Sequence, residues 1–587
     1  MINRITERDR IRGCILGKAI GGTLGTPVEG RMELLDLTYY NPVPTSVLPN
    51  DDFDIQLLFL EAVEGAGGLV DTHFLAKAWS ERMLFPYDEY GVATYNLKRG
   101  LLPPVSGSFD NPFKNCMGCP IRSELWALLA PGKPWRAAYF AMQDGMIDHG
   151  AESIAAEMFF AALESLAFGG EPDFRVLIKE ALNCIDPATD TAKAVGYILD
   201  NSRAMDWQRL REEVLIRFGH PNFTEAPQNI AFTLFGLLYY PDDFEKALLC
   251  TTNCGYDTDC TAATIGAIWG LVKGPGFPER WLKPIGDRML ASHGVFDMSV
   301  PQKVDDLTGH VLRVKDLTEA RYDGFSEQDA AEAIRMQLQD LTAFRPAPDT
   351  KLTLSGGCVV KRDKGLLLKT SEPVQAAFVR TPFTACVTEQ GIKVTAPQAG
   401  VLPAEVRVTI ETRDGRLFQV GLVTPHELWQ AESEDVETLL RMAGQQGFDP
   451  EFRPLDLMDR SFNLRDLTDK KWLLLRGFFH VAVFDKYRPC VFAESPVRSW
   501  LDGVGVLDRK TGTPCIPAPH RQRDGVTGKD AELSAGWHRW DMLFDTHEQI
   551  RDGRVCILVA HAYTKQLVNM RFRRAVAGVY GYGSYAV

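Results

Sequence analysis

The sequence predicts an all-α domain followed by a β-rich domain. From about residue 8 to about residue 343, apolar residues recur at intervals of three and four, which is the spacing of amphipathic helices. Beyond this region, short runs of alternating apolar and polar residues are separated by turn residues, which is typical of strands. The chain has 587 residues, more than one typical domain, so its length also favours two or three domains.

The helical half consists of apolar segments joined by Gly, Pro or Asp, which end or start helices. In chain order these segments are IRGCILGKAIGGTLG, IQLLFLEAVE, HFLAKAWSERML, ELWALLA, AAEMFFAALESLAF, VLIKEALNCI, AFTLFGLLYY and FEKALLCTT. A polar segment with two prolines, QDLTAFRPAPDTKLTL, then ends the helical pattern. We therefore expect a domain boundary near residue 345, with an all-α domain over residues 1–345.

The remaining residues, 346–587, predict a β-sandwich or a similar β-rich domain of about 240 residues. The strand candidates are GCVVKRDKGLLLKT, IKVTAP, EVRVTIETRDGRLFQVGLV, KKWLLLRGFFHVAVF and GRVCILVAHAY. The RDKG and RDGR sequences are flanked by alternating residues, which indicates tight hairpin turns.

Composition excludes several classes of function. Lys and Arg number 64 against 77 Asp and Glu, a net charge of -13 with no long basic cluster, so nucleic acid and anionic membranes are not expected partners. The first residues lack the apolar run of a secretory signal, and no stretch approaches a membrane span of about 18 apolar residues. We therefore expect a cytoplasmic protein.

Twelve cysteines are too few for a disulfide framework in a chain of this length. Cys116 and Cys119 form a CxxC pair, but no second pair and no HxxxH sequence follows at the spacing of a zinc finger. Two interpretations stay open for this pair: a zinc site, or cysteines that pack in the core or in a loop.

Two groups of aspartates precede apolar helix patterns. PNDDFDIQL contains Asp51, Asp52 and Asp54, and GYDTDC contains Asp257 and Asp259 just before AATIGAIWGLV. Acids at a helix start can be solvated caps, because free amides and the helix dipole favour negative charge there. Burial of carboxylates, however, needs compensation. The alternative is therefore that both groups converge on one or two hard divalent cations, which prefer oxygen ligands.

Five ordered motifs between about residues 8 and 340 resemble the ADP-ribosylglycohydrolase family. They are DRIRGCILGKAIGGTLGTPVEG, PNDDFDIQL, GCPIRSELWALLAPG, MIDHGAESIAAEMFFAAL and GYDTDCTAATIGAIWGLVKGPGFPERW. The family includes ADP-ribosylarginine hydrolase and the dinitrogenase reductase activating glycohydrolase. The NDDxD and DTDC patterns resemble a divergent bacterial branch of it. The resemblance implies an orthogonal all-α bundle whose pocket holds divalent metal.

The metal ligands that the resemblance implies are Asn50, Asp51, Asp52, Asp257 and Asp259. The expected cofactor is Mg²⁺, as one or two ions, with Mn²⁺ or Ca²⁺ as alternatives.

The resemblance also implies roles for residues outside the metal ligands. Glu29, in TPVEG, and Asp52 correspond to catalytic positions, and Gly118, Arg122 and His149 correspond to substrate-binding positions. Each has a structural alternative. Glu29 can be an ordinary polar residue at a helix end, Arg122 a surface residue, and His149 a capping or packing residue.

Four positions depart from the family pattern. Asn50 stands where the family has Thr or Ser, and Gly22 stands in the place of an acid. Phe53, which is followed by a further acid at Asp54, and Cys260 each stand where the family has a Thr. Cysteine is a soft ligand that suits Mg²⁺ poorly. These departures leave the number of metal ions open.

The function implied is hydrolysis of an N- or O-linked ribosyl or related glycosyl bond, in an ADP-ribosylated protein, a nucleoside or a small glycoside. The alternative is a non-catalytic protein that keeps the fold and binds ADP-ribose or carbohydrate. The β-rich half contains Trp500, Trp537 and Trp540 with His520 and Arg521, a composition found in sugar-stacking sites, although tryptophans in a sandwich are usually core residues.

Overall fold

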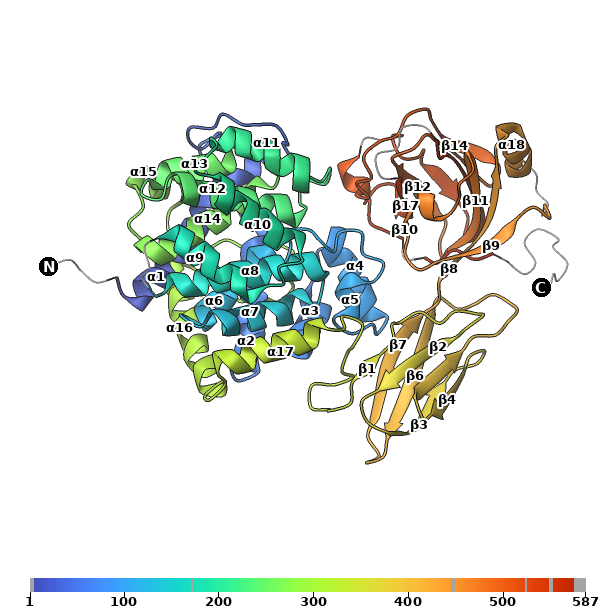
Figure 1. Cartoon of the computed structure of the whole chain (residues 1–587), viewed down its shortest axis with the longest axis horizontal. Coiled ribbons are helices and arrows are strands. Elements are labelled where there is room, and N and C mark those ends of the chain that lie inside the picture. The colour runs from blue at the N-terminus through green and yellow to red at the C-terminus, as the bar shows by residue number, and fades with distance from the viewer. Residues whose placement is uncertain are drawn as a thin grey trace. The chain divides into compact units, whose positions relative to one another are not determined.

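The computed structural model describes residues 5–169, 173–444, 449–522, 525–547, 553–568 and 570–574. The chain forms two compact units (Figure 1). Unit 1 comprises Met1–Phe85, Ser106–Ser108 and Phe113–Leu341, and unit 2 comprises Pro86–Val105, Phe109–Pro112 and Thr342–Val587. The division into domains at residue 345 stays a prediction.

Unit 1 is helical, as predicted. Its α-helices are α1 (Glu7–Gly25), α2 (Asp51–Gly65), α3 (Thr72–Arg82), α6 (Ser123–Leu129), α7 (Pro134–Gly145), α8 (Ala151–Ala167), α9 (Phe174–Ala181), α10 (Asp190–Asn201), α11 (Trp207–Phe218), α12 (Ala226–Tyr239), α13 (Phe244–Thr252), α14 (Thr258–Lys273), α15 (Glu279–Ile285), α16 (Val304–Arg321) and α17 (Glu327–Leu338). Short 3₁₀ helices are η1 (Thr26–Val28), η2 (Pro120–Arg122) and η3 (Leu182–Cys184). The helix α5 (Val105–Ser108) spans the change from unit 2 to unit 1 along the chain.

Helices α1 and α14 cross with their backbones in direct contact. Every fourth residue of α1 from position 13 is glycine, and each faces a small residue of α14. The facing pairs are Gly13 and Gly270, Gly17 and Gly266, Gly21 and Ala262, and Gly25 and Thr258. A Cβ atom added to these α1 glycines would lie between 1.8 Å, at Gly21, and 2.5 Å, at Gly13, from a carbonyl oxygen of α14. We call these eight residues the glycine ladder. Only glycine in α1 permits this separation.

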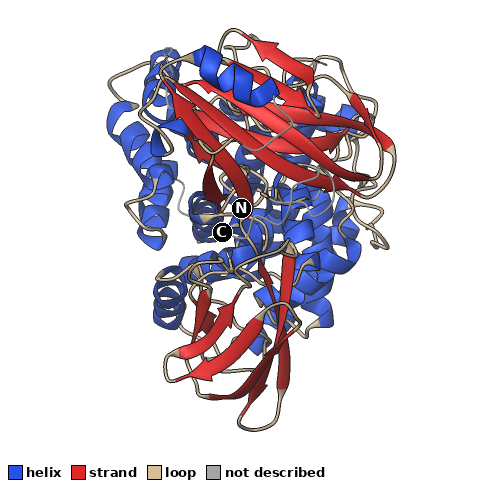
Figure 2. Cartoon of the chain, turned by 90° about the vertical axis from the view of Figure 1, so that its right-hand side faces the viewer, coloured by secondary structure: helices blue, strands red, loops and turns tan. Residues whose placement is uncertain are grey.

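Unit 2 is built mainly from antiparallel sheets, as predicted for the second half (Figure 2). One pair of sheets has the strand orders β1-β2-β5-β4 and β3-β6-β7, and the other has β14-β13-β16-β11-β8-β9 and β10-β17-β12-β15. The strands are β1 (Leu354–Ser355), β2 (Leu366–Thr370), β3 (Val374–Val379), β4 (Thr384–Thr388), β5 (Gly391–Thr395), β6 (Glu405–Thr412), β7 (Leu417–Val423), β8 (His426–Ser433), β9 (Arg453–Leu457), β10 (Ser461–Asn463), β11 (Trp472–Val481), β12 (Asp485–Ala493), β13 (Val497–Leu501), β14 (Val504–Arg509), β15 (Ala531–Leu533), β16 (Gly536–Asp545) and β17 (Arg554–His561).

Helices are few in unit 2. The α-helices are α4 (Asp88–Lys98) and α18 (Val436–Gly444), and the 3₁₀ helices are η4 (Leu464–Asp466) and η5 (Pro519–Arg521). Helix α18 packs Leu439 and Met442 against Leu474 of β11 and Leu543 of β16.

Each pair of sheets encloses its own apolar core, so the β-rich half contains two main cores where we expected one sandwich. The predicted RDGR turn joins β6 to β7, which pair in register from Glu405 opposite Val423. Trp540 is fully buried in the second core, which supports the core interpretation for this residue, whereas Trp500 and Trp537 are half-buried.

A segment from the first half of the chain contributes to unit 2. Leu101 and Val105 pack in the first apolar core, and Asp110 lies in a buried ionic cluster. The Asp110 carboxylate accepts hydrogen bonds from Arg460 Nε at 3.1 Å and Nη2 at 2.9 Å, and His426 Nε2 lies 3.4 Å from it. The sequence does not predict that residues 86–105, which include helix α4, belong to unit 2.

The CxxC cysteines are both buried. Cys116 Sγ accepts a hydrogen bond from Asn222 Nδ2 at 3.1 Å. Within the described ranges, neither cysteine belongs to a group of three or more side chains that could hold a metal ion. The core interpretation of this pair is therefore favoured over the zinc site.

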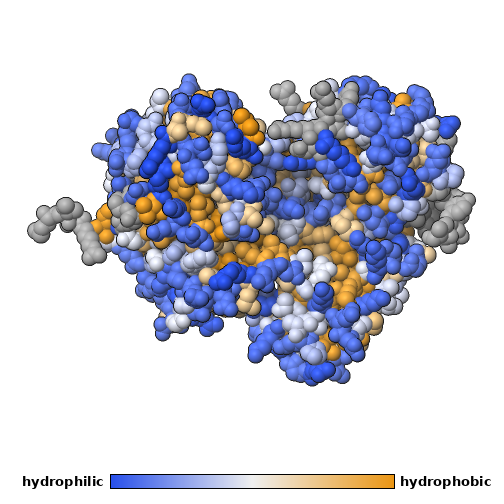
Figure 3. Space-filling view, in the orientation of Figure 1, coloured by the Kyte–Doolittle hydropathy of each residue, from blue (hydrophilic) through white to orange (hydrophobic). Residues whose placement is uncertain are grey.

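The helices of the described chain include none that is both long and apolar enough to cross a membrane. On the face shown in Figure 3, hydrophilic residues predominate and hydrophobic residues gather in smaller patches.

We predict that Gly17→Ala lowers the free energy of unfolding by about 3 kcal/mol, because the new methyl group must displace a packed backbone. Its Cβ would lie 1.9 Å from the carbonyl oxygen of Gly266. The matched control is Gly196→Ala in α10, where no atom lies within 4 Å of the new Cβ; this substitution should raise stability by up to about 1 kcal/mol. Chemical denaturation of both variants gives the comparison, and equal effects would contradict the prediction.

We also predict that His426 contributes to acid sensitivity. Burial, together with the charge of Arg571, lowers the pKa of His426 to about 3. The unfolded chain therefore binds a proton below about pH 6.5 that the folded chain excludes, so stability falls as the pH drops from about 6.5 towards 3, by up to about 1.4 kcal/mol per pH unit. Unfolding curves between pH 7 and 5 should show a shallower loss for His426→Gln, and the same slope as wild type for His480→Gln, which changes an exposed residue of β11.

Candidate active site

Two aspartates at the start of α14 form a buried acidic cluster with the cysteine that follows. Asp257 and Asp259 are 2% and 8% exposed, and the ligand atoms of Asp257, Asp259 and Cys260 all lie within 4.8 Å of one another. Asp257 occupies the N-cap position, yet its side chain does not cap the helix. The carboxylate therefore remains available for another partner.

The charge of this cluster is not compensated by a cationic side chain of the described chain. Burial raises the pKa of Asp257 well above its usual range, and the carboxylates of Asp259 and Glu29 raise it further. Burial also raises the pKa of Asp259, whereas hydrogen bonds from Asp257 and Cys260 oppose that rise. Oδ1 of Asp259 is buried, and no described residue forms a hydrogen bond with it. An oxygen atom in this state fits a ligand of a divalent cation.

The loop that carries Glu29 is bonded to the loop that precedes the acidic cluster. The amide of Gly30 donates to the Tyr256 carbonyl at 2.9 Å, and the amide of Tyr256 donates to the Arg31 carbonyl at 2.7 Å. Tyr256 adopts a φ of 68°, which is unusual for a residue with a side chain. Glu29 is exposed, and its charge acts on the pKa of Asp257, so the structure brings these two predicted residues together.

Arg211 of α11 holds the same two loops from the inside of unit 1. Its Nε donates to the Cys254 carbonyl and its Nη2 to the Met32 carbonyl, both at 2.7 Å. The guanidinium also lies over the rings of Phe232 and Tyr256, with 5.7 Å and 5.6 Å to the ring centroids. The buried Arg211 guanidinium thus joins the loop that carries Glu29 to the loop that precedes the acidic cluster.

Asn229 of α12 adds a further connection at the cluster. Its Oδ1 accepts the amide of Asp257 at 3.2 Å, and its Nδ2 donates to the carbonyls of Phe223 and Glu225 at 2.7 and 2.8 Å. Arg211 and Asn229 were not predicted from the sequence. Both lie in ordinary helical patterns, and no local motif distinguishes them from other polar helix residues.

The second acidic group begins α2. Asn50 precedes the helix, and its carbonyl accepts the amide of Phe53 at 3.2 Å. A Cβ atom at Gly22 would lie 3.0 Å from Nδ2 of Asn50 and 3.8 Å from Cβ of Ala263, one turn beyond Asp259 on α14. Gly22 therefore lies between Asn50 and α14, where a larger residue would crowd the amide.

The acids that follow Asn50 differ in their surroundings. Asp51 is half-buried, and the side chain of Asp52 lies outside what the structure describes. Asp54 is fully buried and accepts the Ser292 amide at 2.9 Å and the Ser292 hydroxyl, so this third acid has a structural partner of its own.

Arg122 lies fully buried in an ionic network. Its Nε and Nη2 donate to Asp144, its Nη1 and Nη2 donate to Asp148, and Nη1 also donates to the Gly118 carbonyl at 2.8 Å. These bonds hold the turn from Gly118 to Arg122 in place. His149 is also fully buried, with Nδ1 2.8 Å from Oδ1 of Asp148. Substrate contact by Gly118, Arg122 and His149 stays a prediction. The alternative that Arg122 is a surface residue is wrong, because its side chain is fully buried.

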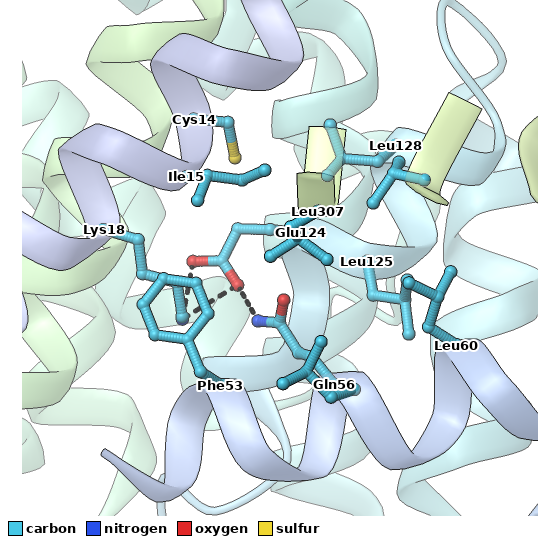
Figure 4. Close-up of a pocket in the computed structure, with 12 residues that line it drawn as sticks. Cys14, Ile15, Lys18, Phe53, Gln56, Leu60, Glu124, Leu125, Leu128 and Leu307 are labelled. Atoms are coloured by element: carbon cyan, nitrogen blue, oxygen red, sulfur yellow. Dashed lines mark hydrogen bonds and ion pairs between the residues drawn. The ribbon is translucent and has the colours of Figure 1, made fainter. Parts of the chain in front are cut away.

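A second buried ion pair, Lys18 and Glu124, also contacts this turn. Lys18 Nζ donates to Glu124 Oε1 at 3.0 Å, and Gln56 Nε2 donates to Glu124 Oε2 at 2.7 Å (Figure 4). Both nitrogens also donate to the Ile121 carbonyl, Lys18 Nζ at 2.8 Å and Gln56 Nε2 at 3.1 Å. Beside the pair is a cavity of about 20 Å³, which is room for about one water molecule. Lys18 and Gln56 thus connect α1 and α2 to the turn that follows Gly118.

We predict that Arg211→Met loosens the two loops that Arg211 joins. Loss of two charge-assisted hydrogen bonds should cost about 3 kcal/mol of stability. The amides of Gly30 and Tyr256 should exchange hydrogen faster than in wild type, which mass spectrometry of exchanged peptides measures. The control is Arg217→Met on the same helix, a partly exposed residue paired with Glu213, which should change stability by no more than about 0.5 kcal/mol. Equal exchange in wild type and Arg211→Met would contradict this role.

Known proteins are similar to parts of this chain. A protein of Archaeoglobus fulgidus described as uncharacterized is 25% identical over 300 residues, which are 48% of this chain and 92% of that protein. The structure of an ADP-ribosylglycohydrolase-related protein complex is 18% identical, with a TM-score of 0.38, and the match covers 53% of this chain and 99% of the other. A β-glucosidase from Kluyveromyces marxianus is 12% identical, with a TM-score of 0.18 and coverage of 45% and 35%. The family model for ADP-ribosylglycohydrolase matches residues 3–320, and the chain belongs to this family.

Proposed function

We propose that this protein hydrolyses a glycosidic bond to ribose or a related sugar with the help of a divalent cation. The observation that carries the proposal is the buried pair Asp257 and Asp259, in which Oδ1 of Asp259 has no hydrogen-bond partner among the residues that the structure describes. Two carboxylates without a cationic partner in the described chain are stable together when a cation binds them.

In this proposal Asp257 and Asp259 bind the cation together with Asn50, Asp51 and Asp52 from the start of α2. Their oxygen atoms suit Mg²⁺ best, as one or two ions, and also suit Mn²⁺ or Ca²⁺. The bound cation would orient sugar hydroxyls and lower the pKa of water. Cys260 adds a thiol where the family has a hydroxyl, and this softer group favours Mn²⁺ over Mg²⁺ more than a threonine would.

Glu29 and Asp52 are the proposed catalytic acids and bases. Glu29 is exposed next to the buried cluster, so it can exchange a proton with water while Asp257 and Asp259 stay shielded. A carboxylate in this position would remove a proton from the attacking water as positive charge develops on the sugar. The Gly30 and Arg31 hydrogen bonds to Tyr256 keep Glu29 beside the cluster.

The proposed substrates are an ADP-ribosylated protein, a nucleoside or a small glycoside. The turn from Gly118 to Arg122 and the residue His149 would line the substrate-binding side of the site. Their backbone atoms would contact the substrate, since the Arg122 guanidinium is already bonded to Asp144 and Asp148. A cytoplasmic location without nucleic-acid or membrane partners belongs to the same proposal, and the net charge of -13 supports it.

We predict that Asp259→Asn changes the stability without metal and the gain in stability on metal binding in different ways. Without metal, the variant should be as stable as wild type or more stable by about 1 kcal/mol, because it removes a repulsive buried charge. With Mg²⁺ or Mn²⁺ at about a hundred times the dissociation constant, wild type should gain about 2.7 kcal/mol and the variant should gain little. Melting curves with and without metal measure both effects.

Asp54→Asn is the matched control, because this nearby buried acid binds Ser292. It should lower stability and keep the full metal-induced shift. The absence of any metal shift in wild type would contradict the metal site.

Turnover separates an enzyme from the alternative, a protein that binds ADP-ribose or carbohydrate without cleaving it. Wild type with metal should release free sugar from at least one member of a panel of ADP-ribosylated peptides, nucleosides and furanosides. Glu29→Gln should lower that rate about a hundredfold or more while keeping the metal shift. Binding of a panel member without release of sugar by wild type would favour the alternative.

A further inference from the structure

Unit 2 contains a buried ionic cluster in which positive charge exceeds negative charge. Its cations are Arg99, Arg460 and Arg571, which are between 2% and 6% exposed. The acids beside them in the described chain are Asp110, which is 1% exposed, and Asp459, which is half-buried. Three guanidiniums thus face two carboxylates, and a buried charge without a counterion is unfavourable.

Both carboxylates of the cluster are already bonded. Oδ1 of Asp110 accepts the Arg460 amide at 2.7 Å and Nε at 3.1 Å, and Oδ2 accepts Nη2 at 2.9 Å. Oδ1 of Asp459 accepts the amide of Asp110 at 2.9 Å. Nη1 of Arg571 reaches Oδ2 of Asp110 only at 3.4 Å, which is longer than a normal charge-assisted hydrogen bond. Arg460 therefore has a full carboxylate partner, whereas Arg571 shares one that is already paired.

Two guanidinium nitrogens of this cluster have no hydrogen-bond partner among the described residues. They are Nη2 of Arg571 and Nε of Arg99, and both atoms are shielded from solvent. Both guanidiniums lie against the ring of Phe109, with Cζ 5.0 Å from the ring centroid for Arg571 and 5.9 Å for Arg99. Buried donors of this kind indicate an ion or a water molecule that completes the site.

The cations of the cluster also act on one another. Burial, together with the charges of Arg571 and Arg460, lowers the pKa of Arg99 to about 10. Burial also lowers the pKa of Arg571, and the charge of Arg460 adds to this effect. A further negative charge nearby would therefore favour the charged form of both side chains.

We propose that a monovalent anion of the halide class, chloride in particular, binds beside Nη2 of Arg571. One negative charge brings the two carboxylates and the three guanidiniums into balance. Arg99 and Asp110 come from the segment of the first half of the chain that belongs to unit 2, whereas Arg460 and Arg571 follow its strands β9 and β17. The anion would therefore stabilise the attachment of this segment within unit 2. This inference does not depend on the proposed function.

The surroundings of Arg571 favour a halide over other occupants. A water molecule would complete the N–H groups but would leave the excess charge in place. Phosphate and sulfate carry more charge and bind water more strongly, so their dehydration costs more than that of chloride. The excess of one positive charge among the described residues of the cluster fits one chloride ion.

Melting curves of the full chain in sodium chloride, sodium bromide and sodium gluconate test the site. Equal salt concentrations keep charge screening the same, so a difference between the anions reports specific binding. Unit 2 of wild type should melt about 3 °C higher, or more, in chloride and in bromide than in gluconate. A water molecule in place of the anion predicts the same melting temperature in all three salts, and that result would overturn the proposal.

Arg571→Met separates anion binding from a purely structural role of Arg571. The change removes the excess positive charge and leaves Asp110 with Arg460, so the halide effect should disappear. In gluconate the variant should melt at or above the temperature of wild type. A variant that melts lower than wild type by the same amount in every salt would contradict anion binding. The matched control is Arg416→Met, an exposed arginine paired with Asp414 between β6 and β7, which should keep the full halide effect.

Crystals of wild type grown in bromide provide a measurement that does not depend on stability or on a variant that folds. Anomalous scattering should locate a bromide ion beside Nη2 of Arg571. A water molecule at this position, or a carboxylate of the chain itself, would overturn the proposal.

Discussion

The direct contact between α1 and α14 is the constraint on which the candidate active site depends. The glycine ladder lets the two backbones approach until carbonyl oxygens of α14 lie where side chains of α1 would be. At the last contact, Thr258 Oγ1 donates to the Gly25 carbonyl at 2.9 Å, directly between Asp257 and Asp259 in sequence. The acidic cluster therefore lies at the end of α1, and Glu29 follows a few residues later.

Buried carboxylates occur at several places in this protein, and four of them have a guanidinium partner. Asp144 and Asp148 share Arg122, Asp110 is paired with Arg460, and Asp541 is paired with Arg476. A guanidinium favours the charged form of its carboxylate, and the charges of Arg460 and Arg571 hold the pKa of Asp110 well below its usual range despite its burial. Asp257 and Asp259 have each other, the Cys260 thiol and the charge of Glu29, and that arrangement is favourable only with an external cation or with bound protons.

The local patterns of the sequence predict much of this architecture. Apolar spacing distinguishes helices from strands, and the acids before α2 and α14 are found at helix starts as predicted. The patterns do not predict which distant parts of the chain lie together in the fold. Leu101 and Val105 lie in the half of the chain expected to be all-α, yet they join a core formed mainly by strands beyond residue 350. Arg211 and Asn229 hold the acidic cluster through backbone carbonyls and an amide. Any helix residue of suitable length can make such contacts, so no sequence signal marks them.

The repeating spacing of the glycine ladder leaves the position of α1 along α14 unspecified. A helix that slides along its neighbour by four residues, about 6 Å, again places small residues against small residues. The ladder thus determines how near the helices lie but not their register. Register is determined at one end, where Thr258 binds Gly25 and Tyr256 binds the chain around Gly30. The residues beside the acidic cluster therefore determine the register of α1 against α14, the longest buried helix contact of unit 1. Substitutions there would shift the whole pair of helices as well as the chemistry between them.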